Sequence, residues 1–433
     1  MKLAVIGTGY VGLVTGACFS SLGNQVVCVD KDPKRVALLK KGRVPFYEPG
    51  LPELVAKNTK AGRLKFTRKL AGAVSSAEVV FIAVGTPSRS NGQADVSAVI
   101  EVAKEISGVM KKLRHGHKVI VNKSTVPVGM GDIVSKILVE NKVPKNNFSV
   151  VSNPEFLREG SAIGDFMRPD RVVIGADNSQ AFNIITDLYR PLNAHIIFTS
   201  IKSAELIKYA SNAFLATKIS FINEIANICE RVGSDISEVA NAVGLDKRIG
   251  RHFLNAGLGY GGSCLPKDVS ALVHLSRENG HEPMLLSAVR EVNEFQIDAF
   301  IGKIIKKLGN LRSKNIAVLG LAFKPETDDM REAPSIKVVQ ALIKKGARVS
   351  AYDPAAAPNA SRLIKEAKLV KDMFTAIEGA DALVVLTEWP EFVEIDLERV
   401  KKALKSPLIF DGRNIYDRGR VEDAGLEYVG VGR

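Results

Sequence analysis

The chain has 433 residues, of which 46% are hydrophobic and 25% are charged, a composition typical of a globular protein with two or three domains. No apolar run approaches the about 20 residues of a membrane-spanning helix, and the N-terminal residues predict a strand instead of a signal peptide, so we expect a cytoplasmic protein without a membrane partner. The net charge of +13 suggests an acidic partner. Because no nucleic-acid-reading motif occurs, a phosphorylated small molecule explains this charge as well as DNA does.

Neither the cysteines nor the histidines predict a metal site. Cys18, Cys28, Cys229 and Cys264 have no metal-type spacing, and in a chain of this size they do not indicate a disulfide framework. The pattern His115-Gly-His117 has no third ligand near it, and such pairs are more often surface features. We therefore expect no bound metal.

The first predicted elements form a nucleotide-binding turn. A strand at 2–7 leads into Gly7-Thr-Gly-Tyr-Val-Gly12 and then into a helix. These glycines allow a tight turn, close approach of a pyrophosphate and close packing of helix on strand, which is typical of dinucleotide binding. Asp30 ends the next strand, where its carboxylate can accept hydrogen bonds from ribose hydroxyls. The same charge would repel a 2′-phosphate and so favours NAD, although Lys31 and Arg35 weaken this preference.

The following elements alternate between strand and helix. Further strands are predicted at 79–84, 119–122, 149–152 and 172–175. This alternation predicts a parallel, doubly wound sheet. The turns Val84–Pro87 and Lys123–Pro127 each end a strand at the edge where such sheets bind ligands, but an ordinary strand end closed by proline is an equal alternative. The loop Asn153–Glu159 contains two carboxylates that could orient water or a sugar, or could be a solvated turn.

Residues 201–231 contain no proline or glycine and have apolar residues at helical spacing, which predicts one long helix or two nearly continuous ones. Such a helix suits a connection between domains and a dimer contact. Lys208 and Asn212 lie on one face of it, which continues with the apolar residues Leu215 and Ile219. On a buried face these two polar side chains need partners or a function; a lysine at an exposed stripe is the alternative.

A glycine-rich stretch at 259–268, GYGGSCLPKD, places Cys264 just before a helix that we expect to begin at Pro266. The helix N-terminus and Lys267 would both stabilise a thiolate, and the small neighbours leave room for a substrate. A nucleophile is therefore favoured over a small residue that fills a turn.

The strand and turn pattern restarts after Lys314. We expect strands at 315–323, 347–354, 382–389 and 407–414, with a helix at 335–345. The fold class is therefore α/β, with two Rossmann-like doubly wound domains joined by a long central helix and a helical dimerisation region.

Seven motifs occur in order across nearly the whole chain: GTGYVG, STVPVG, NPEFLREGSAIGDF, ELIKYASNAFLA, RIGRHFLNAGLGYGGSCLPKD, AFKPETDDMREAPS and DGRN. Together they resemble the UDP-glucose/GDP-mannose dehydrogenase family. The resemblance implies an NAD-binding domain at 1–198, a central helical dimerisation region carrying the cysteine loop at 199–300, and a UDP-sugar-binding domain at 301–433. The resemblance also implies a homodimer. It implies no nucleic acid as a functional partner.

The implied reaction converts UDP-glucose, two NAD+ and water into UDP-glucuronate and two NADH through a covalent cysteine thiohemiacetal and thioester. One alternative is a relative that oxidises GDP-mannose or UDP-N-acetylmannosamine. A two-electron hydroxyacid dehydrogenase would have no use for Cys264. A non-catalytic nucleotide-binding protein is the third alternative, and it predicts eroded motifs.

The resemblance also implies roles for individual residues. Cys264 matches the nucleophile, and Lys208 and Asn212 match the pair that stabilises the oxyanion. Asp268 and Thr125 match residues that hold the catalytic water, and Glu155 matches a loop carboxylate. The positions assigned to cofactor binding are Gly7, Gly9, Tyr10, Val11, Gly12, Asp30, Arg35, Gly85, Thr86, Pro87, Ser124, Thr125, Glu159, Lys267 and Arg331. Those assigned to substrate binding are Glu155, Phe156, Leu157, Arg158, Glu159, Lys208, Asn212, Arg248, Asn255, Gly259, Tyr260, Gly261, Phe323, Lys324 and Arg413, with Arg248 reaching the neighbouring subunit's sugar nucleotide. One departure is Met130, where the family usually has threonine.

Overall fold

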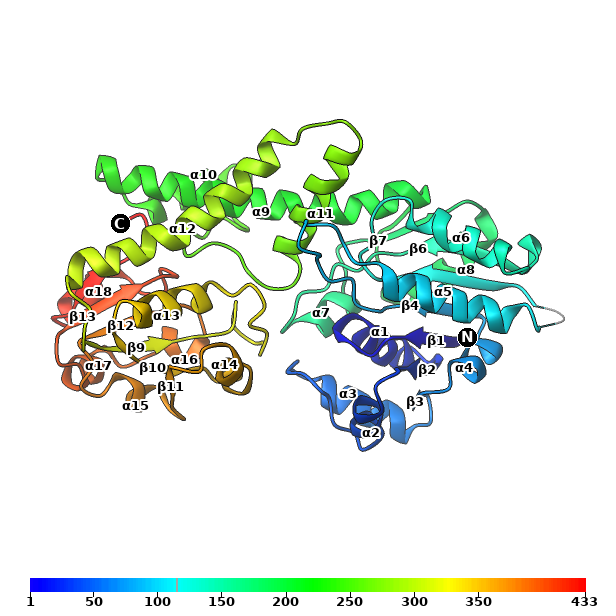
Figure 1. Ribbon diagram of the computed structural model, residues 1–433, viewed down its shortest axis with the longest axis horizontal. Helices are drawn as coiled ribbons and strands as arrows, with labels where there is room; N and C mark the ends of the chain where they lie inside the picture. The colour runs from blue at the N-terminus through cyan, green and yellow to red at the C-terminus, as the bar shows by residue number, and fades with distance from the viewer. Residues whose placement is uncertain (114–115) are drawn as a thin grey trace. The chain divides into compact units, whose positions relative to one another are not determined.

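The computed structural model describes residues 1–113 and 116–433, so that His115 lies outside the described residues (Figure 1). The chain divides into two compact units. Unit 1 comprises residues 1–211 and 270–275, and unit 2 comprises residues 212–269 and 276–433. Both units are built around a twisted sheet with helices on its faces, which confirms the predicted fold class. The division into three domains stays a prediction.

Unit 1 contains a sheet with the strand order β3-β2-β1-β4-β5-β6-β7-β8. Its strands are β1 (Lys2–Ile6), β2 (Gln25–Val29), β3 (Leu64–Thr67), β4 (Val79–Ile82), β5 (Lys118–Asn122), β6 (Phe148–Ser152), β7 (Val172–Ala176) and β8 (Ile196–Thr199). The first six follow the Rossmann order and run parallel. β7 pairs with β6 in the antiparallel direction, so the last two strands depart from the all-parallel sheet expected from the sequence.

Helices cover both faces of this sheet. They are α1 (Tyr10–Ser21), α2 (Pro33–Lys40), α3 (Leu51–Lys60), α4 (Leu70–Ser76), α5 (Ser97–Met110), α6 (Met130–Glu140), α7 (Ala162–Met167), α8 (Ser179–Tyr189) and the short 3-10 turns at Lys145–Asn147 and Arg190–Leu192. Alternate residues of β1 enter two separate cores: Leu3 and Val5 pack with α1 and α8, whereas Ala4 and Ile6 pack with α5 and α6. Burial on both faces explains why residues 3–6 of β1 are all apolar, whereas Lys2 at its start is exposed.

Unit 2 repeats the same Rossmann order in a second sheet, β11-β10-β9-β12-β13-β14, with parallel pairing throughout. Its strands are β9 (Asn315–Leu319), β10 (Arg348–Tyr352), β11 (Lys368–Leu369), β12 (Ala382–Val385), β13 (Leu408–Asp411) and β14 (Glu427–Val429). Its helices are α10 (Ile236–Leu245), α12 (Met284–Leu308), α13 (Pro334–Lys344), α14 (Ala357–Leu363), α15 (Met373–Ile377), α16 (Pro390–Val393), α17 (Leu397–Ala403) and α18 (Arg418–Asp423).

Two helices contain residues of both units. α9 (Ile201–Val232) is one uninterrupted helix, which confirms the longer of the two predicted forms. α11 (Leu265–Glu278) follows the cysteine loop and passes from unit 2 into unit 1 and back. Among the described residues, none of the helices is long and apolar enough to cross a membrane.

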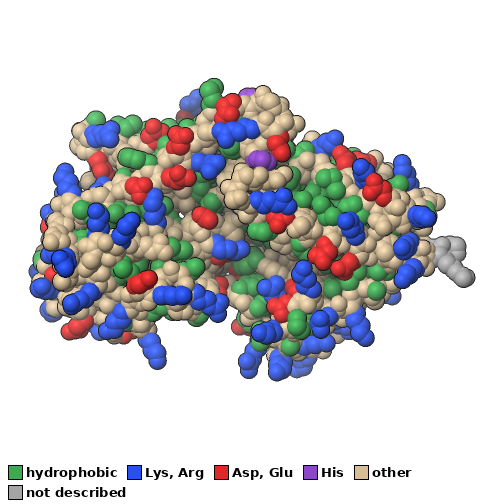
Figure 2. Space-filling model, viewed as in Figure 1, with side chains coloured by type: hydrophobic (Ala, Val, Ile, Leu, Met, Phe, Trp, Pro, Cys, Tyr) green, Lys and Arg blue, Asp and Glu red, His purple; other side chains and the backbone are tan. Residues whose placement is uncertain are grey.

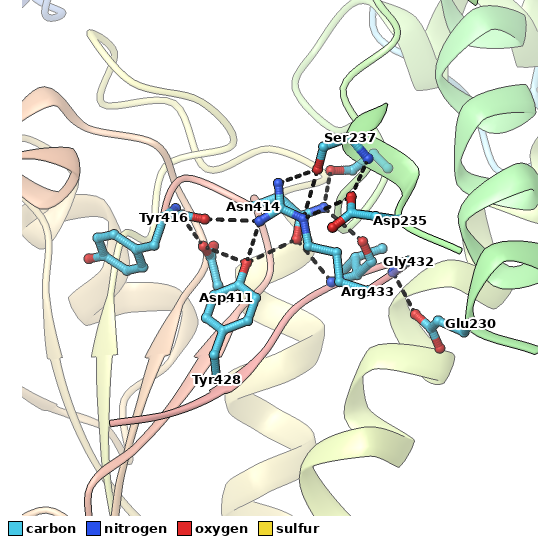
Figure 3. A network of polar contacts seen from close by, with 11 residues as sticks. Glu230, Asp235, Ser237, Asp411, Asn414, Tyr416, Tyr428, Gly432 and Arg433 are labelled. Atoms are coloured by element: carbon cyan, nitrogen blue, oxygen red, sulfur yellow. Dashed lines mark hydrogen bonds and ion pairs between the residues drawn. The ribbon is translucent and has the colours of Figure 1, made fainter. Parts of the chain in front are cut away.

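A polar network in unit 2 fastens the residues after β14 (Figure 3). The Arg433 guanidinium donates hydrogen bonds to Ser237 Oγ at 2.8 Å, to the Tyr416 carbonyl at 2.9 Å and to the Tyr428 hydroxyl at 3.2 Å. The neighbouring Gly432 N–H donates to Glu230 at 2.6 Å. The network therefore ties the sheet of unit 2 to α9 and to the start of α10.

We expect Arg433→Ala to lower the free energy of unfolding by about 2 kcal/mol, because charge-assisted hydrogen bonds to half-buried partners are lost. Differential scanning calorimetry measures this loss as a lower melting temperature. The matched control is Arg420→Ala, since Arg420 is exposed on α18. Equal melting temperatures of the two variants would contradict the role assigned to Arg433.

Candidate active site

The glycine loop lies between β1 and α1, as predicted. A Cβ on Gly7 would lie 2.6 Å from the Ala83 carbonyl oxygen, and one on Gly12 would lie 2.0 Å from the Gly7 carbonyl oxygen. Both glycines are therefore required by close packing. Gly9 precedes α1, and among the described residues, its own chain neighbours aside, no atom lies within 4 Å of the position its Cβ would take. The N-terminus of this 12-residue helix can thus be approached closely by a phosphate, so the loop fits a dinucleotide.

Asp30 is a buried carboxylate at the end of β2. Its Oδ2 atom accepts hydrogen bonds from the Thr8 N–H at 2.9 Å and from the Thr8 hydroxyl at 2.6 Å. Burial raises the pKa of Asp30, but the hydrogen bonds from Thr8 and Asp32 and the charge of Arg35 outweigh it, so the pKa lies below its usual value. The carboxylate therefore stays charged, and Oδ1, which accepts the Asp32 N–H at 2.9 Å, has a second lone pair for a ribose hydroxyl. Lys31 pairs with Glu101 instead, at 3.4 Å.

The two turns predicted to face the cofactor follow the neighbouring strands β4 and β5 and are bonded to each other. The Ser124 hydroxyl donates to the Val84 carbonyl at 2.6 Å. The Thr86 hydroxyl donates to the Thr125 carbonyl at 2.8 Å. Because both turns lie at the carboxyl ends of parallel strands, they occupy the edge where open α/β sheets bind ligands.

Lys208 and Glu155 form a buried ion pair in unit 1. Glu155 lies in the loop after β6 and Lys208 lies on α9; each side chain is 4% exposed, and Nζ lies 3.1 Å from Oε1. The other carboxylate oxygen accepts the Leu157 N–H at 2.6 Å. The alternative of an exposed, solvated lysine is therefore wrong. The ammonium group of Lys208 also lies over the ring of Phe156 in the same loop, with 5.4 Å between Nζ and the ring centre.

Lys123 is a buried lysine for which the sequence analysis named no role. Its ammonium donates to Asn153 Oδ1 and to the Tyr189 hydroxyl, both at 3.1 Å. Burial lowers the pKa of Lys123 to about 7; the charge of Glu155 opposes this shift, and the charge of Lys208 adds to it. In the sequence Lys123 directly follows an apolar strand, which does not by itself predict that its side chain is buried.

The cysteine loop lies in unit 2. Cys264 is half-buried and directly precedes α11, which begins at Leu265, so Pro266 is the second helical residue instead of the first. Asp268, in the first turn of α11, is fully buried. Its Oδ2 atom accepts the Asn212 side-chain amide at 2.6 Å, and its Oδ1 atom pairs with Lys267. The Asp268 N–H also donates to the Cys264 carbonyl at 2.9 Å.

The glycines of this loop serve close packing. A Cβ on Gly261 would lie 2.3 Å from the Glu332 carbonyl oxygen, and one on Gly262 would lie 2.6 Å from the Phe323 ring. The protein itself thus fills the space on the side where a Cβ would lie, and the assignment of Gly261 to substrate binding stays a prediction. The Arg413 guanidinium donates to the carbonyls of Gly259 at 3.1 Å and Phe323 at 3.2 Å.

The other predicted site residues have varied surroundings, and the backbone of Arg331 touches the cysteine loop, because the Gly262 N–H donates to the Arg331 carbonyl at 2.9 Å. Arg248 is exposed and pairs with Asp246, Arg331 pairs with Asp329, and Asn255 is exposed. Arg158 pairs with Asp165 at 2.6 Å. Tyr260 is buried, and the Lys324 ammonium lies 5.6 Å from the centre of the Phe323 ring. The part of the chain that the structure describes contains no group of three or more His, Cys, Asp or Glu residues arranged for a metal.

The charged surface is mixed. On the face in view in Figure 2, Lys and Arg side chains are spread over both units and are interspersed with Asp and Glu. This arrangement is typical of a solvated surface.

A glycine loop at the head of a Rossmann sheet, followed by an acidic residue at the end of the second strand, defines the class of NAD-dependent oxidoreductases. Comparison with known proteins gives the family. Three models of the UDP-glucose/GDP-mannose dehydrogenase family match the chain: the NAD binding domain at residues 1–193, the central domain at 202–295 and the UDP binding domain at 317–418. The chain belongs to this family.

Similar proteins match over the full length. The chain is 50% identical to the UDP-glucose 6-dehydrogenase TuaD of Bacillus subtilis (strain 168), covering 100% of this chain and 93% of that protein. It is 51% identical to the UDP-glucose 6-dehydrogenase of Rhizobium meliloti (strain 1021), with 100% of both covered. The structure of a UDP-glucose dehydrogenase from the hyperthermophilic archaeon Pyrobaculum islandicum matches with a TM-score of 0.92 and 40% identity, covering 99% of this chain and 97% of that one.

We expect iodoacetamide to alkylate Cys264 first in the native protein. Burial raises the pKa of the Cys18 and Cys28 thiols to about 12, and Cys229 is also buried, whereas Cys264 is half-buried beside a helix N-terminus. Mass spectrometry of tryptic peptides after short exposure identifies the modified thiol. Rapid labelling that persists in Cys264→Ser would contradict this assignment.

We expect the stability of the protein to rise between pH 7 and pH 9 through Lys123. Its pKa is about 7 in the folded protein, whereas an unfolded lysine has about 10.4, so the unfolded state binds more protons in this window. The free energy of unfolding then increases with pH by up to about 1.4 kcal/mol per unit. Lys123→Met removes the group, and denaturant titrations at both pH values give the difference. If the free energy of unfolding changed with pH in the same way in both proteins, the pKa of Lys123 in the folded protein would not be near 7.

Proposed function

We propose that this chain oxidises UDP-glucose to UDP-glucuronate, with two NAD+ and one water consumed and two NADH released. The observation that carries the proposal is the position of Cys264 directly before α11, with Asp268 buried in the first turn and bonded to Asn212. The relatives named UDP-glucose 6-dehydrogenase, at 50% and 51% identity over the whole chain, support the choice of substrate.

The four-electron oxidation needs a way to hold the aldehyde between its two steps. The glycine loop and Asp30 would hold NAD+, and two successive NAD+ molecules would supply the hydride acceptors for the two oxidations. The Cys264 thiolate adds to the aldehyde carbon, forming a carbon–sulfur bond and an alkoxide that takes up a proton. The second oxidation converts this thiohemiacetal into a thioester. Water then attacks the thioester, breaks the carbon–sulfur bond and returns the thiol, with Thr125 and Asp268 assigned to hold that water.

Lys208 and Asn212 are assigned to stabilise the negative oxygen that develops in these steps. The Lys208 ammonium has three donors and uses one on Glu155, and the Asn212 amide has two donors and uses one on Asp268. Both side chains are therefore held in place by buried carboxylates. Donors that are oriented in advance are the usual way to stabilise an oxyanion.

The remaining assignments follow the family motifs. Glu159, Lys267 and Arg331 are proposed to contact the cofactor, in addition to the glycine loop and Asp30. Phe323, Lys324 and Arg413 are proposed to contact the sugar nucleotide. All three lie within the match to the UDP binding domain.

A homodimer is proposed from exposed apolar side chains. On α9, Phe214, Phe221 and Ile228 recur at a spacing that places them on one helix face, and Phe214 is 65% exposed. Met284 and Leu285 on α12 are 79% and 65% exposed. Contiguous exposed apolar surface commonly marks a protein interface, and a second copy of the chain would cover it. Arg248, exposed beside α10, would then be able to serve the neighbouring subunit.

The test measures NADH formed per sugar nucleotide for UDP-glucose, GDP-mannose and UDP-N-acetylmannosamine. We expect two NADH per UDP-glucose and much slower turnover of the other two. Cys264→Ser should lower turnover roughly 10³-fold or more, because the covalent intermediate cannot form. The matched control is Cys229→Ser, which removes a buried thiol outside the proposed site.

Each other outcome favours a named alternative. One NADH per UDP-glucose would indicate a simple two-electron dehydrogenase, and no NADH from any of the three would indicate a non-catalytic nucleotide-binding protein. Preference for another sugar nucleotide would change the substrate and keep the chemistry. Wild-type turnover by Cys264→Ser would contradict the covalent mechanism.

A further inference from the structure

A buried carboxylate that has no role in the chemistry above lies in the segment between α2 and α3 of unit 1. Glu48 is 3% exposed. Its Oε2 atom accepts the Gly160 N–H at 2.6 Å, and its Oε1 atom accepts the Ala162 N–H at 2.8 Å. The Tyr10 hydroxyl also donates to Oε2. One side chain thus binds donors from two segments far apart in the sequence.

These two segments carry different parts of the proposed site. Tyr10 is the first residue of α1 and directly follows Gly9 of the dinucleotide loop. Gly160 and Ala162 close the loop that begins after β6 and carries Glu155 and Glu159. The Gly160 N–H also lies 2.8 Å from the Tyr10 hydroxyl oxygen, so the loop end contacts both the carboxylate and the phenol.

The segment that carries Glu48 is itself firmly placed. Phe46 packs on the Tyr10 ring with 5.0 Å between ring centres, so the ring and the hydroxyl of Tyr10 are held by the same few residues. Leu51, which begins α3, is fully buried in the core that also contains Leu13 of α1. The carboxylate therefore has a rigid base on which to hold the two segments.

We propose that Glu48 is a positioning residue that couples the cofactor loop to the sugar-nucleotide loop, so that binding of one ligand strengthens binding of the other. The inference rests on the proposed function. If Tyr10 moves, Gly160 loses one of its two acceptors; if the loop end moves, Glu48 loses two donors. Each segment is therefore best held when the other is in place.

A carboxylate suits this task because it only accepts. Three donors converge on its two oxygens. Glutamine has the same shape but replaces one oxygen with an amide that donates, and that amide would face a backbone N–H. Glu48→Gln is therefore the sharpest substitution, and Tyr10→Phe removes only the hydroxyl from the other side of the contact.

The experiment titrates NADH by fluorescence with and without saturating UDP-glucose, a pair that does not turn over. For the wild type we expect UDP-glucose to lower the NADH dissociation constant by at least about five-fold. In Glu48→Gln and in Tyr10→Phe this ratio should fall to nearly one. The double variant should lose little more than either single variant, because both changes break the same connection.

The matched control is Glu53→Gln, which neutralises an exposed carboxylate in the first turn of α3 and should keep the wild-type ratio. A general loss of structure would weaken each ligand alone and leave the ratio unchanged. If Glu48→Gln does not fold, Tyr10→Phe carries the test.

Two results would overturn the coupling while the proposed function stands. One is a wild-type enzyme that turns over UDP-glucose with a ratio of one, and the other is a Tyr10→Phe or folded Glu48→Gln variant with the wild-type ratio. A wild-type protein that neither binds nor oxidises UDP-glucose would contradict the proposed function itself, and the coupling would be rejected with it.

Discussion

Buried carboxylates need partners, and this need determines which polar side chains lie on the buried face of α9. Glu155 and Asp268 are almost inaccessible to water, and an unpaired carboxylate in such a place costs several kcal/mol. Lys208 pairs with the first, and Asn212, one turn later, donates to the second. The otherwise apolar face of α9 therefore has to hold one cation and one amide in this order. Their positions are fixed before any ligand arrives, which is what electrostatic stabilisation of a transition state requires.

The dinucleotide loop obeys a related constraint on backbone. Gly7 and Gly12 are required because a Cβ at either position would overlap a carbonyl oxygen, whereas Gly9 leaves the end of α1 accessible. The carboxylate of Asp30 is then fixed by Thr8, inside the same loop. Small residues thus bring a helix N-terminus and an anionic acceptor to one place, where they act on different parts of a dinucleotide.

The sequence predicts those features that depend on local pattern. The GxGxxG turn, the uninterrupted α9 and the repeated strand and helix alternation follow from glycine spacing and apolar periodicity over short windows. β3, Leu-Lys-Phe-Thr, and β14, Glu-Tyr-Val, lack the continuous apolar run that marks the similarly short β4. The reversed direction of β7 depends on how the connection after β6 returns to the sheet, which no local pattern records.

In the candidate site, the sequence indicates a buried polar side chain where such a residue interrupts an apolar stripe, as Lys208 and Asn212 do on α9. It fails where burial comes from residues far along the chain. Lys123 is enclosed by Tyr189, 66 residues away, and Glu48 by Gly160, 112 residues away. Before folding, both side chains resemble any charged residue in a turn. Their function as buried partners arises only from the tertiary contacts around them.

The thiols show why position, more than residue type, determines reactivity. Cys18 and Cys28 lie in the core of unit 1, where burial raises the pKa of each thiol to about 12 and removes the thiolate. Cys264 lies outside a helix whose first turn presents N–H groups, and the adjacent Lys267 pairs with Asp268. Gly261 and Gly262 bring its loop into close contact with Glu332 and Phe323, which a Cβ at either position would overlap. The nucleophilic role proposed for Cys264 would gain from such a closely packed loop, because a group that is already positioned loses less freedom in the reaction step.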